Sequence, residues 1–123
     1  MATPNTITIE QVLNSGGLAV KDNAVNLEGL NEKIVLFLAA AAQVHAALFH
    51  VPLVVTSGKD QEHISHSKHF IGRAVDLRLS DLDAVGQTIC HIAFTYLACK
   101  CECGIFWEFT ETPESHLHVE TND

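Results

Sequence analysis

Apolar and polar positions follow a helical period in the first part of the chain. The segment "TIEQVLNSGG" predicts a short helix that ends at its two glycines. Residues 30–49 predict a long alanine-rich helix, which Pro52 bars from continuing. Gln43 and His45 interrupt this apolar stretch, which is also short for a bilayer, so we expect a buried helix rather than a membrane-spanning one.

Shorter apolar runs follow and predict strands. Residues 53–58, "LVVTSG", and 74–78, "AVDLR", are typical of two strands, and the polar, aperiodic residues 59–73 between them predict a loop. The segment "SDLD" then predicts the start of a helix that has Ser80 as its N-cap and runs to about Leu97.

The last part of the chain predicts a β-hairpin. "GIFWEFT", residues 104–110, and "HLHVE", residues 116–120, alternate apolar and polar positions on either side of Pro113. No repeat or linker divides the chain, so residues 1–123 are expected to form one domain. Because helices come first and most strands follow, the sequence predicts an α+β fold with a small, mostly antiparallel sheet packed on helices.

Charge and the first residues argue against some partners and compartments. The 123 residues carry a formal net charge of −8, from 15 acidic and 7 basic side chains, which would repel nucleic acid. The start, "MATPNTITIEQ", has neither the basic region nor the apolar core of a secretory signal. We therefore expect synthesis in the cytoplasm without a signal peptide, no nucleic-acid partner and no membrane insertion.

Fourteen residues in the second half hold all four cysteines, Cys90, Cys99, Cys101 and Cys103. The alternate spacing of "CKCEC" differs from the two-residue gap of common zinc sites. Without a secretion signal, we expect free thiols at the end of a helix and the start of a strand rather than disulfides. A redox or metal-storage role built on "CKCEC" is the alternative that this spacing leaves open.

The stretch "SHSKHFIGRAVDLR" places His69 seven residues before Asp76. Seven residues of helix would separate two side chains by about 10 Å along the axis, too far for ligands of one metal ion. We therefore expect a turn near Gly72 that returns the chain along a strand, since glycine tolerates the backbone angles of such a turn. Asp76 would project from this strand on the side opposite to Val75 and Leu77, which can face the core.

The segment "HLHVE" puts His116, His118 and Glu120 on one face of a strand, with the two apolar residues between them on the other. One histidine could bind a metal while the other reaches a metal-bound water or a substrate. His69, Asp76 and one of these two histidines would give a zinc ion three protein ligands. A fourth position would stay open for water, which is typical of catalytic rather than structural zinc.

Together, "VTSGKDQEHISHSKHFIGRAVDLR" and "HLHVE" resemble the D-Ala-D-Ala carboxypeptidase and L-alanyl-D-glutamate peptidase family of zinc metallopeptidases. The resemblance covers roughly residues 30–120. It implies a hedgehog/DD-peptidase-like fold and a hydrolase that cuts peptidoglycan peptides of the bacterial cell wall, as a bacteriophage endolysin does. A holin or a virion would then bring the protein to the wall.

The resemblance also implies roles for individual residues. His69, Asp76 and His118 match the three protein ligands of one zinc ion. Ser67, two residues before the first ligand, matches a serine that relatives use beside the substrate.

The chain departs from the family pattern at two positions. Asp60 stands where many relatives have a substrate-orienting arginine, so Lys59 or His63 would bind the substrate in its place. Ser115 stands where relatives usually have a carboxylate base, three residues before the last ligand. A serine hydroxyl cannot accept the proton near neutral pH, so His116 is the expected general base, as the first histidine of H-x-H is in a sister group of zinc peptidases.

Two alternatives stay open. Glu114, or a glutamate from the 108–111 stretch, would act as the base if His116 only lines the cleft, although strand alternation points Glu114 away from His118. A zinc-holding structural or binding module without catalysis, as in the hedgehog domain, is the alternative function.

Overall fold

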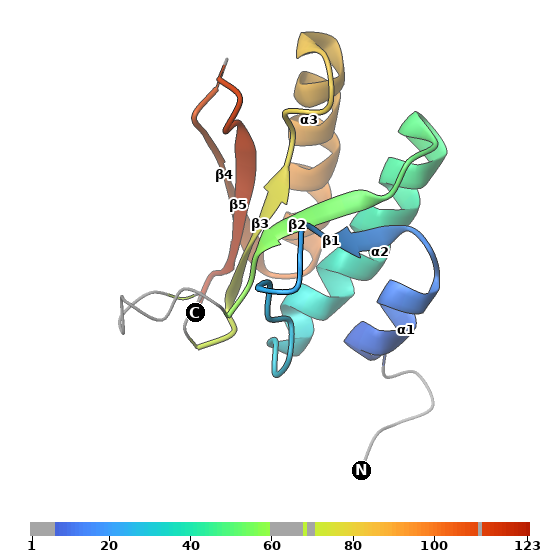
Figure 1. The fold of residues 1–123 in the computed structure, drawn as a ribbon. Coiled ribbons are helices and arrows are strands. Elements are labelled where there is room, and N and C mark those ends of the chain that lie inside the picture. The colour runs from blue at the N-terminus through green and yellow to red at the C-terminus, as the bar shows by residue number, and fades with distance from the viewer. Residues whose placement is uncertain (1–6, 60–67, 69–70, 111) are drawn as a thin grey trace.

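The computed structural model describes residues 7–59, 68, 71–110 and 112–123 (Figure 1). In chain order the elements are α1 (Ile9–Asn14), β1 (Leu18–Val20), α2 (Glu32–Phe49), β2 (Leu53–Ser57), β3 (Ala74–Arg78), α3 (Ala84–Lys100), β4 (Cys103–Glu108) and β5 (His116–Thr121). Each predicted helix and strand is present among them. The three-residue strand β1 is an addition that the sequence did not predict.

The strands form one sheet in the order β1-β2-β3-β5-β4. The last three pairings are antiparallel, whereas β1 runs parallel to β2, so the sheet is mixed. The α+β class is confirmed, but helices and strands alternate more than predicted. The reason is that β1 precedes α2 and that α3 separates β3 from β4.

The three helices lie on one side of the sheet, and the opposite side carries no helix among the described residues (Figure 1). The core fills the space between the two layers. Phe37 of α2 and Phe94 of α3 meet there edge to face, with ring centroids 5.9 Å apart. The fully buried sheet residues against them include Val75, Leu77, Leu117 and Val119. Every other residue of β3 and β5 therefore faces away from the helices.

The long helix α2 has one buried side. By length and composition it could also cross a membrane, a test that core helices pass as well. Here Ile34, Phe37 and Leu38 are fully buried in the core. This packing agrees with the prediction of a buried helix.

The helix α3 begins later than predicted. Asp83, not Ser80, is its N-cap, and the Asp83 carboxylate accepts a hydrogen bond of 2.7 Å from the Gly86 N–H. Ser80 instead lies in a turn in which the Leu82 N–H donates to the Leu79 carbonyl. Both residue types cap helices well, so the sequence alone could not choose between them.

The strand β3 is preceded by the glycine turn that the sequence predicted. Gly72 has a φ of 77°, which side chains rarely adopt, and a Cβ there would lie 2.7 Å from the Gly29 carbonyl oxygen. Both constraints require glycine at this position. Most of the predicted loop before the turn, residues 60–67, 69 and 70, lies outside the described residues.

Candidate metal centre

Asp76 and His118 lie opposite each other on the helix-free face of the sheet. They are register partners in the antiparallel β3–β5 pair, although 42 residues separate them in the chain. The His118 Nδ1–H donates to Asp76 Oδ1 at 2.9 Å. Their neighbours Val75 and Leu77 are fully buried on the other face. The predicted alternation of both strands is therefore confirmed.

The strand β4 brings a third potential ligand to this pair. Glu108 is the register partner of His116 on β5. Asp76, Glu108 and His118 each offer one donor atom, and these atoms all lie within 4.8 Å of one another. Donors of a tetrahedral zinc ion lie about 3.4 Å apart, since the bonds are about 2.0–2.2 Å long. These three residues lie close enough to hold a metal ion after small side-chain movements.

The donor set fits a divalent cation. One imidazole nitrogen and two carboxylate groups suit Zn²⁺ and also other first-row divalent ions. The side chains of Asp76 and His118 are only 12% and 17% exposed, whereas that of Glu108 is 45% exposed. Asp76 and His118 are therefore more shielded from solvent than Glu108.

The predicted ligand His69 lies outside the described residues. The same holds for Ser67 and His63, which were predicted to bind the substrate, and for Asp60. Their roles stay predictions. Lys59 is described, and its side chain runs past Gly29 and Gly72, near the turn that precedes β3.

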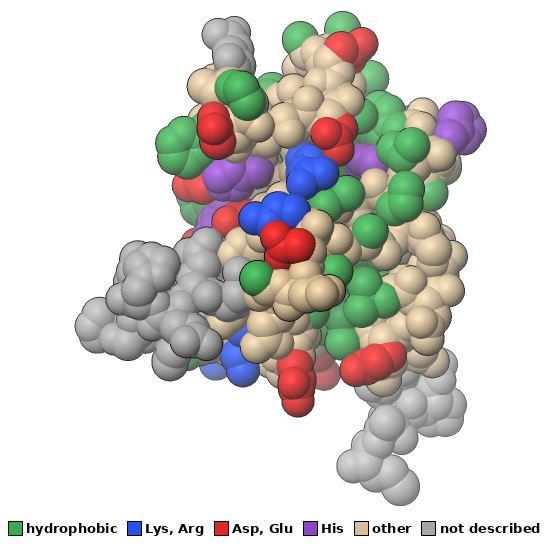
Figure 2. Space-filling view, in the orientation of Figure 1, with side chains coloured by type: hydrophobic (Ala, Val, Ile, Leu, Met, Phe, Trp, Pro, Cys, Tyr) green, Lys and Arg blue, Asp and Glu red, His purple; other side chains and the backbone are tan. Residues whose placement is uncertain are grey.

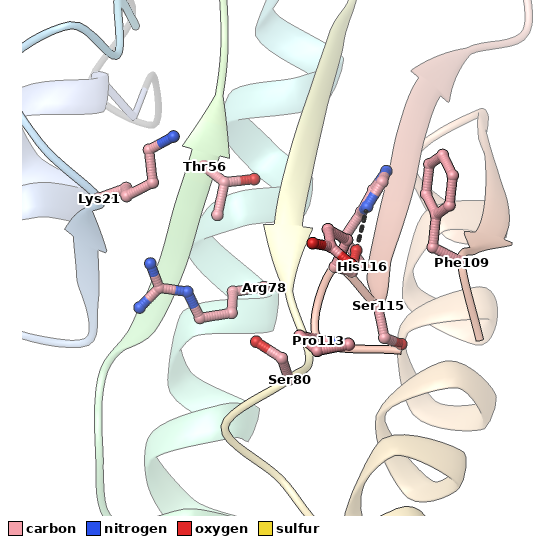
Figure 3. Close-up of a pocket in the computed structure, with 9 residues that line it drawn as sticks. Lys21, Thr56, Arg78, Ser80, Phe109, Pro113, Ser115 and His116 are labelled. Carbon is pink, nitrogen blue, oxygen red and sulfur yellow. Dashed lines mark hydrogen bonds between the residues drawn. The ribbon is translucent and has the colours of Figure 1, made fainter. Parts of the chain in front are cut away.

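His116 is oriented by the chain around it. Its Nδ1–H donates to the Glu114 carbonyl at 2.8 Å, a bond that Figure 3 draws beside the cavity. A carbonyl oxygen only accepts, so Nδ1 carries a proton and Nε2 is the nitrogen available to act as a base. Nε2 lies 2.8 Å from Glu108 Oε1 and 3.9 Å from Asp76 Oδ1. The carboxylates of Glu108 and Asp76 thus both lie near this nitrogen of His116, beside the candidate ligands.

A second network holds His118 from its other side. The His118 Nε2 lies 2.8 Å from Glu120 Oε1, and the Lys68 ammonium lies 2.9 Å from Glu120 Oε2. Lys68 also donates to the Thr121 carbonyl at 2.6 Å. Burial alone would lower the pKa of His118, but its hydrogen bonds to Asp76 and Glu120 outweigh burial and raise that pKa.

Glu120 is kept ionised by the same network. Burial would raise the pKa of its carboxyl group, but the hydrogen bonds and charges of Lys68 and His118 lower it. Strand alternation predicted Glu120 on this face but indicated no role for it. The structure gives it one: it fixes the ring of His118 from the side opposite to Asp76.

Ser115 has a structural role in this chain. It is 2% exposed, and its hydroxyl donates to Gln87 Oε1 at 2.8 Å. The same hydroxyl accepts a bond of 3.0 Å from the Trp107 Nε1–H. The bond to Gln87 ties the hairpin to α3, and the bond from Trp107 on β4 lies within the hairpin. The hydroxyl is therefore not available to the metal cluster. This agrees with the expectation that Ser115 is not a base.

From the sequence, Glu108 was predicted only as one member of the 108–111 stretch that could supply the base. Alternation along β4 gave a signal, because Phe106 and Glu108 face the same side as their partners His118 and His116. The exact register, which decides which glutamate meets the histidines, depends on the hairpin turn.

Comparisons of the chain with protein-family models, curated proteins and solved structures found no match. The geometry of the cluster and the sequence motifs therefore carry the case for its function.

Proposed function

We propose that this protein is a zinc-dependent peptidase that cleaves peptidoglycan peptides of the bacterial cell wall, with a hedgehog/DD-peptidase-like fold. The observation that carries the proposal is the pairing of Asp76 with His118, with His116 beside them. The two motifs that suggested a shared metal site lie far apart in the chain, yet their described residues meet on one face of the sheet. Chance motifs would have no reason to meet there.

His69, Asp76 and His118 are the proposed ligands of one zinc ion, and Glu108 lies within reach as a further ligand. Bound zinc would supply Lewis acidity, which polarises a peptide carbonyl and acidifies water. Both ring nitrogens of His118 bond to carboxylates, Nδ1 to Asp76 and Nε2 to Glu120. To bind zinc, one nitrogen would exchange its carboxylate for the metal, and the hydrogen bond of the other nitrogen would keep the ring oriented.

His116 is the proposed general base. Its Nε2 accepts a proton from the attacking water and later passes it to the leaving amine. The Glu114 carbonyl holds the proton on Nδ1, and the Glu108 carboxylate stabilises the imidazolium that forms. Imidazole is the side chain that enzymes use most often for proton transfer.

Metal analysis and digestion of purified peptidoglycan test this proposal together. We expect one zinc ion per chain, and soluble muropeptides whose masses identify the bond that is cut. Asp76→Asn should lose both zinc and digestion. Glu102→Gln is the matched control, since Glu102 is an exposed carboxylate outside the cluster, and it should keep both. Absence of zinc from the wild-type protein would contradict the proposal.

A zinc-holding module without catalysis is the second candidate. The structural role of Ser115, where relatives have a carboxylate base, favours it. In that case the wild-type protein would bind zinc but release no muropeptides. Only the first candidate, the peptidase, includes the proposal of a bacteriophage protein that a holin or a virion brings to the cell wall.

A further inference from the structure

The side of α3 that faces solvent carries large apolar residues. Val85, Ile89, Ile92 and Tyr96, here called the α3 stripe, are between 41% and 68% exposed. With 3.6 residues per turn, these four positions lie within about 60° of arc around the helix axis. The side that packs against the core is the opposite one, and its buried residues are Gly86, Cys90, Phe94 and Ala98. The helix therefore presents a second apolar side to solvent.

The α3 stripe lies in a stretch without charge. Between Asp83 and Lys100 the sequence has no Asp, Glu, Lys or Arg, in a chain whose net charge is −8. The exposed residues Thr88 and Thr95 donate their hydroxyls to backbone carbonyls of the preceding turn, at 3.0 and 2.6 Å. The solvent side of a surface helix is usually charged or polar. An uncharged apolar side is typical of a surface that a partner covers.

The ends of α3 carry opposite charges. Asp81 and Asp83 lie at its N-terminal end, and Lys100 is its last residue. The α3 stripe is centred between residues 90 and 91. A two-fold axis at this point would place Lys100 of one helix opposite Asp81 of an antiparallel copy. Two parallel helices would instead bring like charges together, so the charges favour the antiparallel arrangement.

The same axis also matches the apolar residues. It places Val85 opposite Tyr96 of the other copy and Ile89 opposite Ile92. The spacing of these residues alternates between four and three, which is the spacing of residues that form the seam between packed helices. A single two-fold axis therefore satisfies both the apolar residues and the charges, as an interface between identical copies requires.

The charged residues at the helix ends are available for such contacts. The Lys100 ammonium lies over the Tyr96 ring, 5.4 Å from its centroid, at the end of the α3 stripe. Asp81 has a long ion pair of 3.5 Å with Arg78, and its side chain is 64% exposed. Glu102, the acid that follows Lys100 in the sequence, pairs with a lysine of α2 at 3.7 Å.

We propose that the α3 stripe is a dimer interface, at which two copies of this chain pack their α3 helices antiparallel. A large side chain has roughly 150–250 Å² of surface, so the four residues present roughly 400–600 Å² per copy. Two copies would bury roughly 800–1,200 Å², around the lower limit of about 1,000 Å² for a specific interface. The dimer is therefore reversible, with a Kd on the order of 10 μM.

A lipid surface is the other class of occupant for an exposed apolar helix. Helices that lie on membranes carry several lysines or arginines on their polar side, which bind anionic lipids. The helix α3 has one, Lys100, and the whole chain has a net charge of −8. Charge therefore favours a second copy of the chain over a membrane.

The dimer would leave the metal cluster accessible. The helices lie on one side of the sheet, and Asp76 and His118 lie on the other (Figure 1). Figure 2 shows purple histidines beside red and blue side chains in the same view. A pocket of about 380 Å³, with His116 in its wall, also lies on the helix-free side (Figure 3). The two sites of a dimer would thus both stay open, and the dimer does not depend on the proposed function.

Sedimentation velocity of the full chain tests this proposal, at concentrations from about 1 to about 300 μM. A reductant is included, because Cys99 is exposed one turn beyond Tyr96 and could form a disulfide between copies. We expect a monomer–dimer equilibrium with a Kd on the order of 10 μM. Ile92→Lys should weaken the dimer at least about tenfold, because it puts charge into the centre of the interface.

Ile71→Lys is the matched control, since Ile71 is an isoleucine of similar exposure in the loop before β3. It should leave the Kd unchanged, and circular dichroism confirms that both lysine variants are folded. A monomer at every concentration would overturn the proposal, as would an Ile92→Lys variant that dimerises like the wild type. Sedimentation of a monomeric wild type with phosphatidylglycerol vesicles would assign the α3 stripe to lipid instead.

A charge exchange tests the antiparallel arrangement. Lys100→Glu and Asp81→Lys should each weaken the dimer about twofold to fivefold at low salt, because exposed ion pairs contribute modestly. The double variant should recover most of the wild-type affinity. Within one copy these residues lie at opposite ends of α3, so recovery requires contact between copies. A double variant no tighter than the single variants would overturn the antiparallel dimer.

Discussion

Two segments of the chain alternate chemically active residues in the same way, yet the fold uses them differently. In "HLHVE" the residues lie on the continuous strand β5, so His116 and His118 share one face. In "CKCEC" each of the three cysteines lies in a different kind of backbone structure. Cys99 lies in α3, Cys101 caps that helix, and Cys103 begins β4. Alternate spacing in the sequence therefore brings side chains onto one face only where the backbone is a regular strand.

The turn between α3 and β4 explains the difference. Glu102 has a φ of 59°, in the left-handed region, which reverses the chain between Cys101 and Cys103. Cys99 is exposed, whereas Cys103 is buried. Among the residues that the structure describes, the cluster of three potential metal ligands is Asp76, Glu108 and His118, without a cysteine. The thiols lie at the end of a helix and the start of a strand, as predicted.

The largest expected effect tests the histidine segment itself. His116→Ala should lower kcat about 10²–10⁴-fold, the usual contribution of a general base, while zinc stays bound. Steady-state rates on a muropeptide and metal content measure the two effects. Glu114→Ala is the control and should change kcat little, because Glu114 contributes its carbonyl rather than its side chain to His116. Loss of activity in Glu114→Ala but not in His116→Ala would show that the base was assigned wrongly.

Removal of a strand-paired ligand should have the next largest effect. His118→Ala should weaken zinc binding by more than about 100-fold, beyond the 10–100-fold loss typical of residues that only support a ligand. Glu120→Gln, which loses the charge beside His118, should fall within that smaller range. Competition with a chromogenic chelator measures both affinities. An unchanged affinity in His118→Ala would exclude the cluster as the metal site.

A moderate effect on stability is expected at Ser115. Ser115→Ala removes the partner of both Gln87 and Trp107 in a buried position. We expect a loss of about 1–3 kcal/mol in the free energy of unfolding, because the Trp107 N–H and Gln87 Oε1 lose their partner at a part-buried site. Urea denaturation followed by circular dichroism measures it. Zinc affinity should stay within about twofold, and a larger change would mean that Ser115 also supports the metal.

The smallest effect is expected in the cysteine segment. Replacement of Cys99, Cys101 and Cys103 by serine should leave the zinc content unchanged. Burial raises the pKa of Cys103 to about 11, so at neutral pH this group is a thiol rather than the thiolate that metals bind. Circular dichroism confirms that the variant is folded before its metal is counted. Loss of zinc from a folded variant would favour the cysteine-based function instead.

The features that could be predicted from the sequence lie in regular backbone or in a local turn, and those that could not depend on distant parts of the chain. Alternation placed Asp76 and His118 correctly, and Gly72 marked the turn, because both signals depend on a few neighbouring residues. The start of α3 and the short strand β1 could not be predicted. They depend on which of two good caps the fold uses and on pairing with the distant strand β2. Glu108 needed the hairpin register, which is a tertiary property.

The single tryptophan of the chain lies at the joint between the hairpin and α3. Its indole N–H is bonded to Ser115, and its ring lies 5.1 Å from that of His91 on α3. Intrinsic fluorescence of Trp107 is therefore a built-in optical reporter of whether the hairpin is docked. Its emission should shift to longer wavelength when the hairpin leaves the helix and water reaches the indole. Because this hairpin carries both histidines, one cuvette measurement would follow the assembly of the site without any label.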